Sequence, residues 1–247
     1  PAEDPGAEHH LLEGLWTCQT VDVVDEALLR RLLGARDPRA RAAATTVLGY
    51  WHERVDGAVA LLGERARDED RRVRLSAVLA LQRIPSAEAL GAALNALERS
   101  PLDPMIDFEL KKAAVVLRPY WYAAFEAGKV DFGGDARRAT YALAALRSAE
   151  ATSKLVAMLR AGVVPVEARY EAVAAVAAHG DAAQAAVVLE AIVGEGLGTG
   201  ERAALMDALA EAAKTRRVTP ASDLGRIAPL IEREDAVGVA AARLAGS

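Results

Sequence analysis

The stretch RDPRARAAATTVLGYW, from Arg36 to Trp51, is followed by DEDRRVRLSAVLALQRI, from Asp68 to Ile84, and the two share a residue pattern. The matched residues, each pair 33 positions apart, are Asp37 and Asp70, Arg41 and Arg74, Ala44 and Ala77, and Leu48 and Leu81. A fixed internal period of about 20 to 50 residues is typical of solenoids, in which each repeat packs only against its neighbours. The sequence therefore predicts a repeat protein.

Apolar residues recur at three- and four-residue spacing along the chain, which predicts amphipathic helices, and no segment alternates as a half-buried strand does. One helix is expected over residues 25–35, and the next begins at Pro38, where the missing N–H needs no partner. Helices continue to the C-terminus, including one over 221–234. We therefore predict an all-α solenoid of about six antiparallel helix pairs.

Residues 1–247 are expected to form a single repeat domain, because no segment resembles a long disordered linker. Two segments interrupt the helices. PYWYAAFEAGKVDFGG, residues 119–134, is predicted to be an aromatic-rich inserted loop, with Pro119 ending the helix before it. GEGLGTG, residues 194–200, is predicted to be a connector. Because the chain starts at Pro1 without a Met, we expect it to be a processed product or an excised domain.

The composition argues against several classes of partner. Thirty basic side chains stand against 35 acidic ones, the net charge is −5, and no Lys/Arg block is longer than two, so nucleic acid is not an expected partner. The single cysteine, Cys18, excludes an internal disulfide or a Cys-pair zinc site. The sequence has no apolar run long enough to span a bilayer, and its first ten residues are polar and acidic, so membrane insertion is not expected. No cofactor is expected either.

Acidic and arginine residues recur at matching places in the repeats. We predict that they form a structural ladder, in which each Arg bridges the turn acid of its own or the next repeat, because a guanidinium can bind a carboxylate through two N–H groups. The functional alternative is an anion-binding stripe on the inner face. The predicted ladder residues are Asp37, Arg41, Asp70, Arg74, Arg169 and Arg202.

Aromatic residues concentrate in one region. Six of the eleven in the chain are Phe108, Tyr120, Trp121, Tyr122, Phe125 and Phe132. They could form a local core that folds the insertion onto the solenoid, or a surface that docks a partner, because aromatic residues dominate interface energetics. The two interpretations do not exclude each other. The candidate partner-binding residues are Tyr120, Trp121, Tyr122, Phe125, Phe132 and Trp16.

Trp16 lies in the N-terminal segment HHLLEGLWTC, residues 9–18. We expect an amphipathic helix there that packs on an upstream domain and exposes Trp16 in the isolated chain. His9 and Glu13 are four residues apart and would lie on one helix face, where they could bind a metal ion. We favour the interpretation in which this helix is amphipathic and holds no metal.

Helix pairs with Asp-Pro at the turn and Arg shortly after, as in Asp37-Pro38 with Arg41, resemble HEAT repeats, including those of phycobilisome lyases. More narrowly, the run from HHLLEGLWTCQ through DEALLRRLLGARDPRARAAATTVLGYW to DFELKKAAVVLRPYW is similar to the HEAT-repeat region of multidomain proteins of planctomycete-type bacteria. There the repeats lie between a membrane-associated, propeller-like dehydrogenase domain and a c-type cytochrome domain. The resemblance implies a right-handed superhelix with second helices on the concave side, and a periplasmic or other extracytoplasmic location. This chain lacks the Cys-x-x-Cys-His motif and propeller repeats.

The predicted function is therefore a non-enzymatic scaffold whose partners are another protein or flanking domains. If the narrower resemblance holds, the scaffold positions dehydrogenase and cytochrome modules for electron transfer. The alternative is a bilin lyase-like enzyme or enzyme subunit, which requires a groove large enough for a tetrapyrrole.

Overall fold

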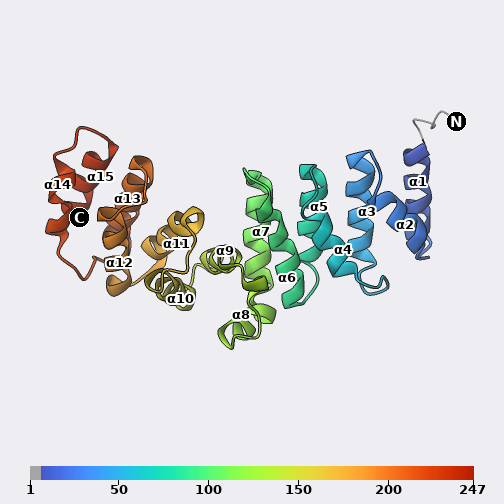
Figure 1. Cartoon of the computed structure of the whole chain (residues 1–247), viewed down its shortest axis with the longest axis horizontal. Coiled ribbons are helices and arrows are strands. Elements are labelled where there is room, and N and C mark those ends of the chain that lie inside the picture. Colours follow the sequence, from blue (N-terminus) through green and yellow to red (C-terminus); the bar gives the residue numbers. More distant parts are fainter. Residues whose placement is uncertain (1–6) are drawn as a thin grey trace. The chain divides into compact units, whose positions relative to one another are not determined.

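The computed structural model describes residues 7–247, which form fifteen α-helices, three 3-10 helices and no strand (Figure 1). The predicted all-α fold is confirmed. Within this part of the chain, no helix combines the length and the apolar character needed to cross a lipid bilayer.

The chain divides into two compact units, unit 1 up to Gly133 and unit 2 from Gly134. The division falls at the end of the segment 119–134 that interrupts the sequence pattern. The single repeat domain expected over 1–247 stays a prediction, and its first six residues lie outside the described ones.

Unit 1 stacks its helices in two rows. The first row contains α1 (Ala7–Thr20), α3 (Pro38–Tyr50), α5 (Arg71–Leu81) and α7 (Pro104–Val116). The second contains α2 (Glu26–Leu33), α4 (Ala58–Arg65), α6 (Ala87–Ala93), which continues into η1 (Leu94–Glu98), and α8 (Arg118–Glu126). Helices α2 and α3, α4 and α5, and α6 and α7 pack as consecutive pairs (Figure 1). The 3-10 helix η2 (Phe132–Gly134) follows α8.

The 33-residue period explains why the helices of the first row begin and face the core in the same way. Asp37, Asp70 and Asp103 each cap a first-row helix by accepting the backbone N–H two residues further on, at 2.7 to 2.9 Å. A carboxylate at this position satisfies amides that have no partner within the helix. The equivalent positions Leu48 and Leu81 are fully buried. The same period thus sets both the start of each helix and the face that enters the core.

The predicted inserted loop is largely a helix. Helix α7 ends at Val116, and Pro119 lies in the first turn of α8, which packs on α6 and α7. The expectation that Pro119 ends a helix is wrong, because proline is equally compatible with the first turn, where its missing N–H is not needed. Residues 127–131 contain no helix.

Unit 2 repeats the arrangement. It contains α9 (Ala136–Leu146), α10 (Ala149–Arg160), α11 (Val166–His179), α12 (Ala182–Val193), α13 (Thr199–Arg216), η3 (Leu224–Ile227), α14 (Ala228–Ile231) and α15 (Ala236–Ala245). Helices α10 and α11, α12 and α13, and α14 and α15 are pairs, which brings the described chain to the predicted six. The prediction of one helix over 221–234 is wrong. Only the 3-10 helix η3 and the four-residue α14, with Pro229 in its first turn, form there. The right-handed superhelix stays a prediction.

Close packing of α3 on α5 leads to a stability prediction. A Cβ added at Gly49 would lie 2.6 Å from the Cβ of Ala80, so Gly49→Ala should force the two helices apart and destabilise the protein by about 1–3 kcal/mol. Gly91→Ala on α6 is the matched control, because its new Cβ would meet only Phe132 at 4.0 Å and should raise helix stability by up to about 1 kcal/mol. Urea unfolding of both variants measures the difference, and equal midpoints would contradict the prediction.

Candidate functional site

Arg41 makes the strongest contact of the predicted ladder. Its Nε and Nη2 donate to the two carboxylate oxygens of Asp68, both at 2.9 Å, and its Nη1 donates to the carbonyl oxygens of Ala35 and Arg36 at 2.9 and 3.1 Å. The side chains of Arg41 and Asp68 are only 9% and 7% exposed. This buried bidentate pair joins the first repeat to the turn of the next.

Two other ladder arginines, Arg74 and Arg202, bind backbone carbonyls in place of carboxylates. Arg74 Nη1 donates to the carbonyl oxygens of Asp68 and Glu69 at 2.8 Å. Arg202 donates to those of Leu197 and Gly194 at 3.1 and 2.6 Å. Their shared role is to satisfy carbonyl groups in the turn before their own helix. Arg169 is half-buried on α11 and lies close to Gly196.

The acids predicted to pair with these arginines do not do so. Asp37 and Asp70 are helix caps, and Asp37 pairs with exposed Arg39 at 2.9 Å. The acid that binds Arg41 is Asp68, which the sequence pattern did not single out. Ala35 occupies the equivalent position one period earlier, so the repeat itself carries no signal for this acid.

The environment of Asp68 favours its ionised form. Burial by itself raises the pKa of this carboxyl, but the hydrogen bonds from Arg41 and from the backbone N–H of Asp70, together with the charge of Arg41, outweigh it. The pKa of Asp68 therefore lies below its ordinary value. The contact is a structural one, within a turn of the solenoid.

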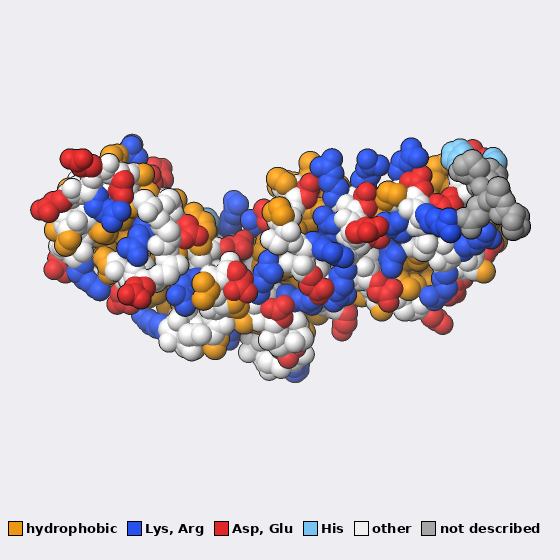
Figure 2. All heavy atoms as spheres, turned by 45° about the horizontal axis from the view of Figure 1, so that its top comes forward, with side chains coloured by type: hydrophobic (Ala, Val, Ile, Leu, Met, Phe, Trp, Pro, Cys, Tyr) orange, Lys and Arg blue, Asp and Glu red, His pale blue; other side chains and the backbone are white. Residues whose placement is uncertain are grey.

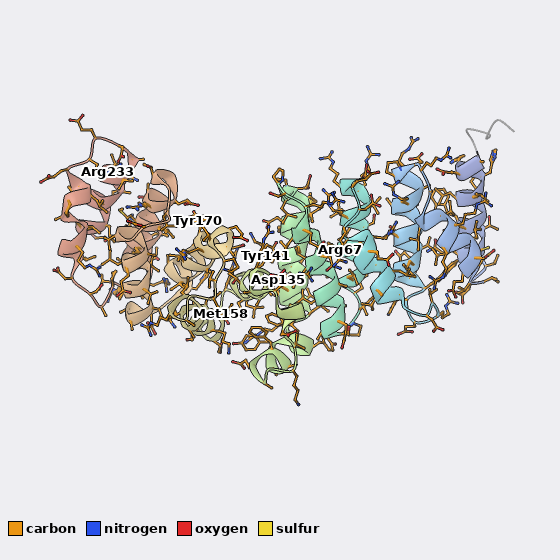
Figure 3. The ribbon with its side chains drawn as sticks, viewed as in Figure 1. Arg67, Asp135, Tyr141, Met158, Tyr170 and Arg233 are labelled. Atoms are coloured by element: carbon orange, nitrogen blue, oxygen red, sulfur yellow. The ribbon has the colours of Figure 1, made fainter. Side chains whose placement is uncertain are left out.

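Arg67 makes a second polar network on the other row of helices (Figure 3). Its Nε lies 2.8 Å from Glu98, and its Nη2 donates to the side-chain oxygen of Asn95 at 2.7 Å. Asn95 in turn donates to the carbonyl of Gly63 at 3.0 Å and is buried. This network links α4 to η1, and no sequence pattern points to it.

The aromatic cluster is a local core. Trp121 is fully buried, and its Nε1 donates to the carbonyl oxygen of Ala114 at 2.9 Å. Its ring centroid lies 5.6 Å from that of Tyr122, 6.0 Å from Phe125 and 5.5 Å from Phe132. Tyr122 and Phe132 are buried and Phe125 is half-buried. Trp121, Tyr122 and Phe132 thus present almost no surface to a partner, which corrects their proposed docking role.

Two candidate partner-binding residues are exposed. Tyr120 on α8 is 49% exposed and Trp16 on α1 is 44% exposed. Helix α1 packs on this chain's own α2 and α3, and the carboxylate of Glu8 accepts the backbone N–H groups of Arg36 and Asp37 at 2.7 and 2.8 Å. Partner binding by Tyr120 and Trp16 stays a prediction.

His9 and Glu13 are the pair that the sequence offered for a metal site. His9 Nε2 lies 3.2 Å from Glu13 on the exposed face of α1. Within residues 7–247, no group of three or more His, Cys, Asp or Glu side chains could hold a metal ion.

The exposed face of α3, α5 and α7 carries two adjoining depressions. One, of about 560 Å³, lies between α5 and α7 at the start of α8, and a smaller one, of about 80 Å³, lies between α3 and α5. They share Leu79 and Arg83, so we treat them as one surface, the α3–α7 groove. Its principal lining residues are Tyr50, Leu79, Arg83, Lys112, Val116 and Tyr120.

Exposed apolar side chains continue from the groove along α7. Met105, Phe108 and Val115 are each about half exposed or more. Figure 2 shows hydrophobic side chains next to a line of basic ones along the upper edge of unit 1, where α3, α5 and α7 begin, at the opposite end of these helices from the groove. An apolar surface bordered by charge is typical of a protein-interaction site.

Residues 26–106 match the family of HEAT repeats. This segment runs from the start of α2 into the first turn of α7, so it contains the periodic part of unit 1. No curated protein and no solved structure gave a match to the chain.

Proposed function

We propose that this chain is a non-enzymatic scaffold that binds a protein partner through the exposed face of α3, α5 and α7. The match to HEAT repeats over residues 26–106 supports the proposal, because HEAT repeats generally serve as protein-interaction scaffolds. Stacked repeats present extended surfaces that suit this role.

The observation that carries the proposal is the repetition of exposed positions at the 33-residue period. Tyr50, Arg83 and Val116 occupy equivalent positions at the ends of three neighbouring helices, and all are exposed. Phe108, at 61% exposed, adds a large apolar side chain to the same face of α7. Exposure of this kind has no role in packing the solenoid and provides anchors for a partner.

The test uses the whole chain as bait in extract from its native source, followed by reconstitution with the purified partner. We expect a complex of fixed stoichiometry by size-exclusion chromatography with light scattering. A Met105→Asp/Phe108→Asp variant should lose it, whereas Val163→Asp/Val166→Asp, at equally exposed positions in unit 2, should retain it. If no protein forms a complex with the chain, the scaffold proposal is wrong. If only the unit 2 variant loses the complex, the binding face lies in unit 2.

The more specific form of the proposal names dehydrogenase and c-type cytochrome modules as the partners, and rests on the sequence resemblance. A denaturing gel of native extract, probed with an antibody to this chain and stained for covalent haem, tests it. A haem-positive band far above 26.0 kDa supports this form. A haem-negative band at 26.0 kDa overturns it and leaves a free-standing adaptor.

The bilin lyase-like alternative is supported by the size of the groove, since about 560 Å³ lies in the range of small-molecule sites. Mixing the chain with a free tetrapyrrole and separating them by gel filtration distinguishes the two functions. A scaffold should release the pigment, and retention of one pigment per chain would favour the alternative.

A further inference from the structure

We propose that the α3–α7 groove binds a linear acidic segment of a partner protein, which inserts two apolar side chains about three residues apart. The inference rests on the proposed scaffold function and adds the chemistry of the partner. It follows from the charge of the groove, the state of its carbonyl groups and the spacing of its two depressions.

The charged residues that line the groove are both basic. They are Arg83 and Lys112, and no carboxylate belongs to the lining. The guanidinium of Arg83 lies over the ring of Tyr50, 5.7 Å from its centroid, and no carboxylate of the described residues pairs with it. Lys112 contacts Glu109 at 3.1 Å and stays half exposed. A guanidinium held in place by an aromatic ring is well suited to bind a carboxylate from a partner.

Several carbonyl groups at the helix ends next to the groove have hydrogen-bond donors within the chain. Helix C-termini carry partial negative charge because their last carbonyl groups lack partners. Here the carbonyls of Val78, Ala80 and Leu81 accept N–H groups from the residues that follow α5. The carbonyls of Ala113 and Ala114 at the end of α7 accept the Leu117 N–H and the Trp121 indole N–H. These five carbonyl groups are thus already hydrogen-bonded within the chain, and the charged side chains that line the groove are Arg83 and Lys112.

The floor of the groove is apolar and has two unequal parts. Leu79, Val116 and Leu117 line the larger depression, whose volume holds a Leu or Phe side chain. The smaller depression, bordered by Gly49 and Ala80, holds a side chain the size of Ala or Val. Adjacent helices pack about 8–10 Å apart. A segment in the polyproline II conformation has three residues per turn and advances about 3.1 Å per residue. Side chains three positions apart therefore point to the same side, about 9 Å from each other, and reach both depressions.

A random 12-residue peptide library displayed on phage and selected on the whole chain provides the probe. We expect selected peptides to carry a large and a small apolar residue three positions apart with Asp or Glu between or beside them. The best peptide, labelled with fluorescein, should lose affinity about tenfold or more with Arg83→Glu, which replaces attraction by repulsion, and also with Val116→Asp. Arg31→Glu is the matched control, since it makes the same charge change at an exposed position on the second row of unit 1. It should change affinity less than twofold.

Circular dichroism of each variant establishes that the helices remain. Selection of basic peptides, or affinity unchanged by Arg83→Glu and Val116→Asp, overturns the groove assignment while leaving the scaffold function intact. Failure to select any peptide also overturns the groove assignment. The scaffold function is then tested separately, by whether the chain forms a complex with a protein from its native source.

Discussion

Trp121→Ala is expected to destabilise unit 1 by about 3–5 kcal/mol. Trp121 is fully buried, contacts three aromatic rings, and donates its indole N–H to the carbonyl of Ala114. Its removal leaves a cavity between α7, α8 and the segment that contains Phe132, and a buried carbonyl without that donor.

Urea unfolding followed by far-ultraviolet circular dichroism measures this loss without relying on tryptophan fluorescence. Tyr120→Ala is the control, because Tyr120 is the preceding residue on the same helix and is 49% exposed, so its loss should change stability by about 0.5 kcal/mol or less. If the two substitutions cost the same, Trp121 is not the centre of a local core.

Arg41→Met should cost about 3 kcal/mol, because it leaves Asp68 buried without its bidentate partner. Arg65, 3.8 Å from Asp68, compensates only in part. Arg39→Met, which breaks the exposed Asp37 pair, should cost at most about 1 kcal/mol.

In a double-mutant cycle, Arg41→Met combined with Asp68→Leu should recover much of the loss, since both buried charges are then absent. Additive losses would argue that the pair is not coupled.

The same pair predicts a dependence on pH. Because the pKa of Asp68 is lower in the folded protein than its ordinary value near 3.9, its stabilising contribution is present above about pH 4 and is lost as pH falls through the folded value. The difference in unfolding free energy between the native chain and Asp68→Asn should therefore be constant from pH 5 to 7 and decrease below pH 4. A constant difference down to pH 2 would contradict the ionic role of Asp68.

The candidate site was less predictable than the fold. Arg41 and Arg74 were identifiable because they recur, whereas the acid that Arg41 binds occurs only once and has Ala35 as its counterpart one period earlier. The exposure of Tyr120 beside the burial of Trp121 depends on how α8 lies on α6 and α7. Neighbouring residues of one helix point in different directions, and composition does not tell which of them faces the core.

The sequence by itself determined the helical class, the period and the Asp caps of the periodic helices α3, α5 and α7, because these follow from local chemistry: apolar spacing, an acid before a helix, and proline in its first turn. Only the tertiary structure decided that Asp68 is the carboxylate that binds Arg41, and that segment 118–126 is a helix with a buried tryptophan. It also decided that Arg83 lies over Tyr50 beside an apolar groove. The Arg41–Asp68 and Arg83–Tyr50 contacts join side chains from different repeats, so their meeting is set by the packing of one repeat on the next. The burial of Trp121 depends on how α8 and the segment after it fold back onto α7.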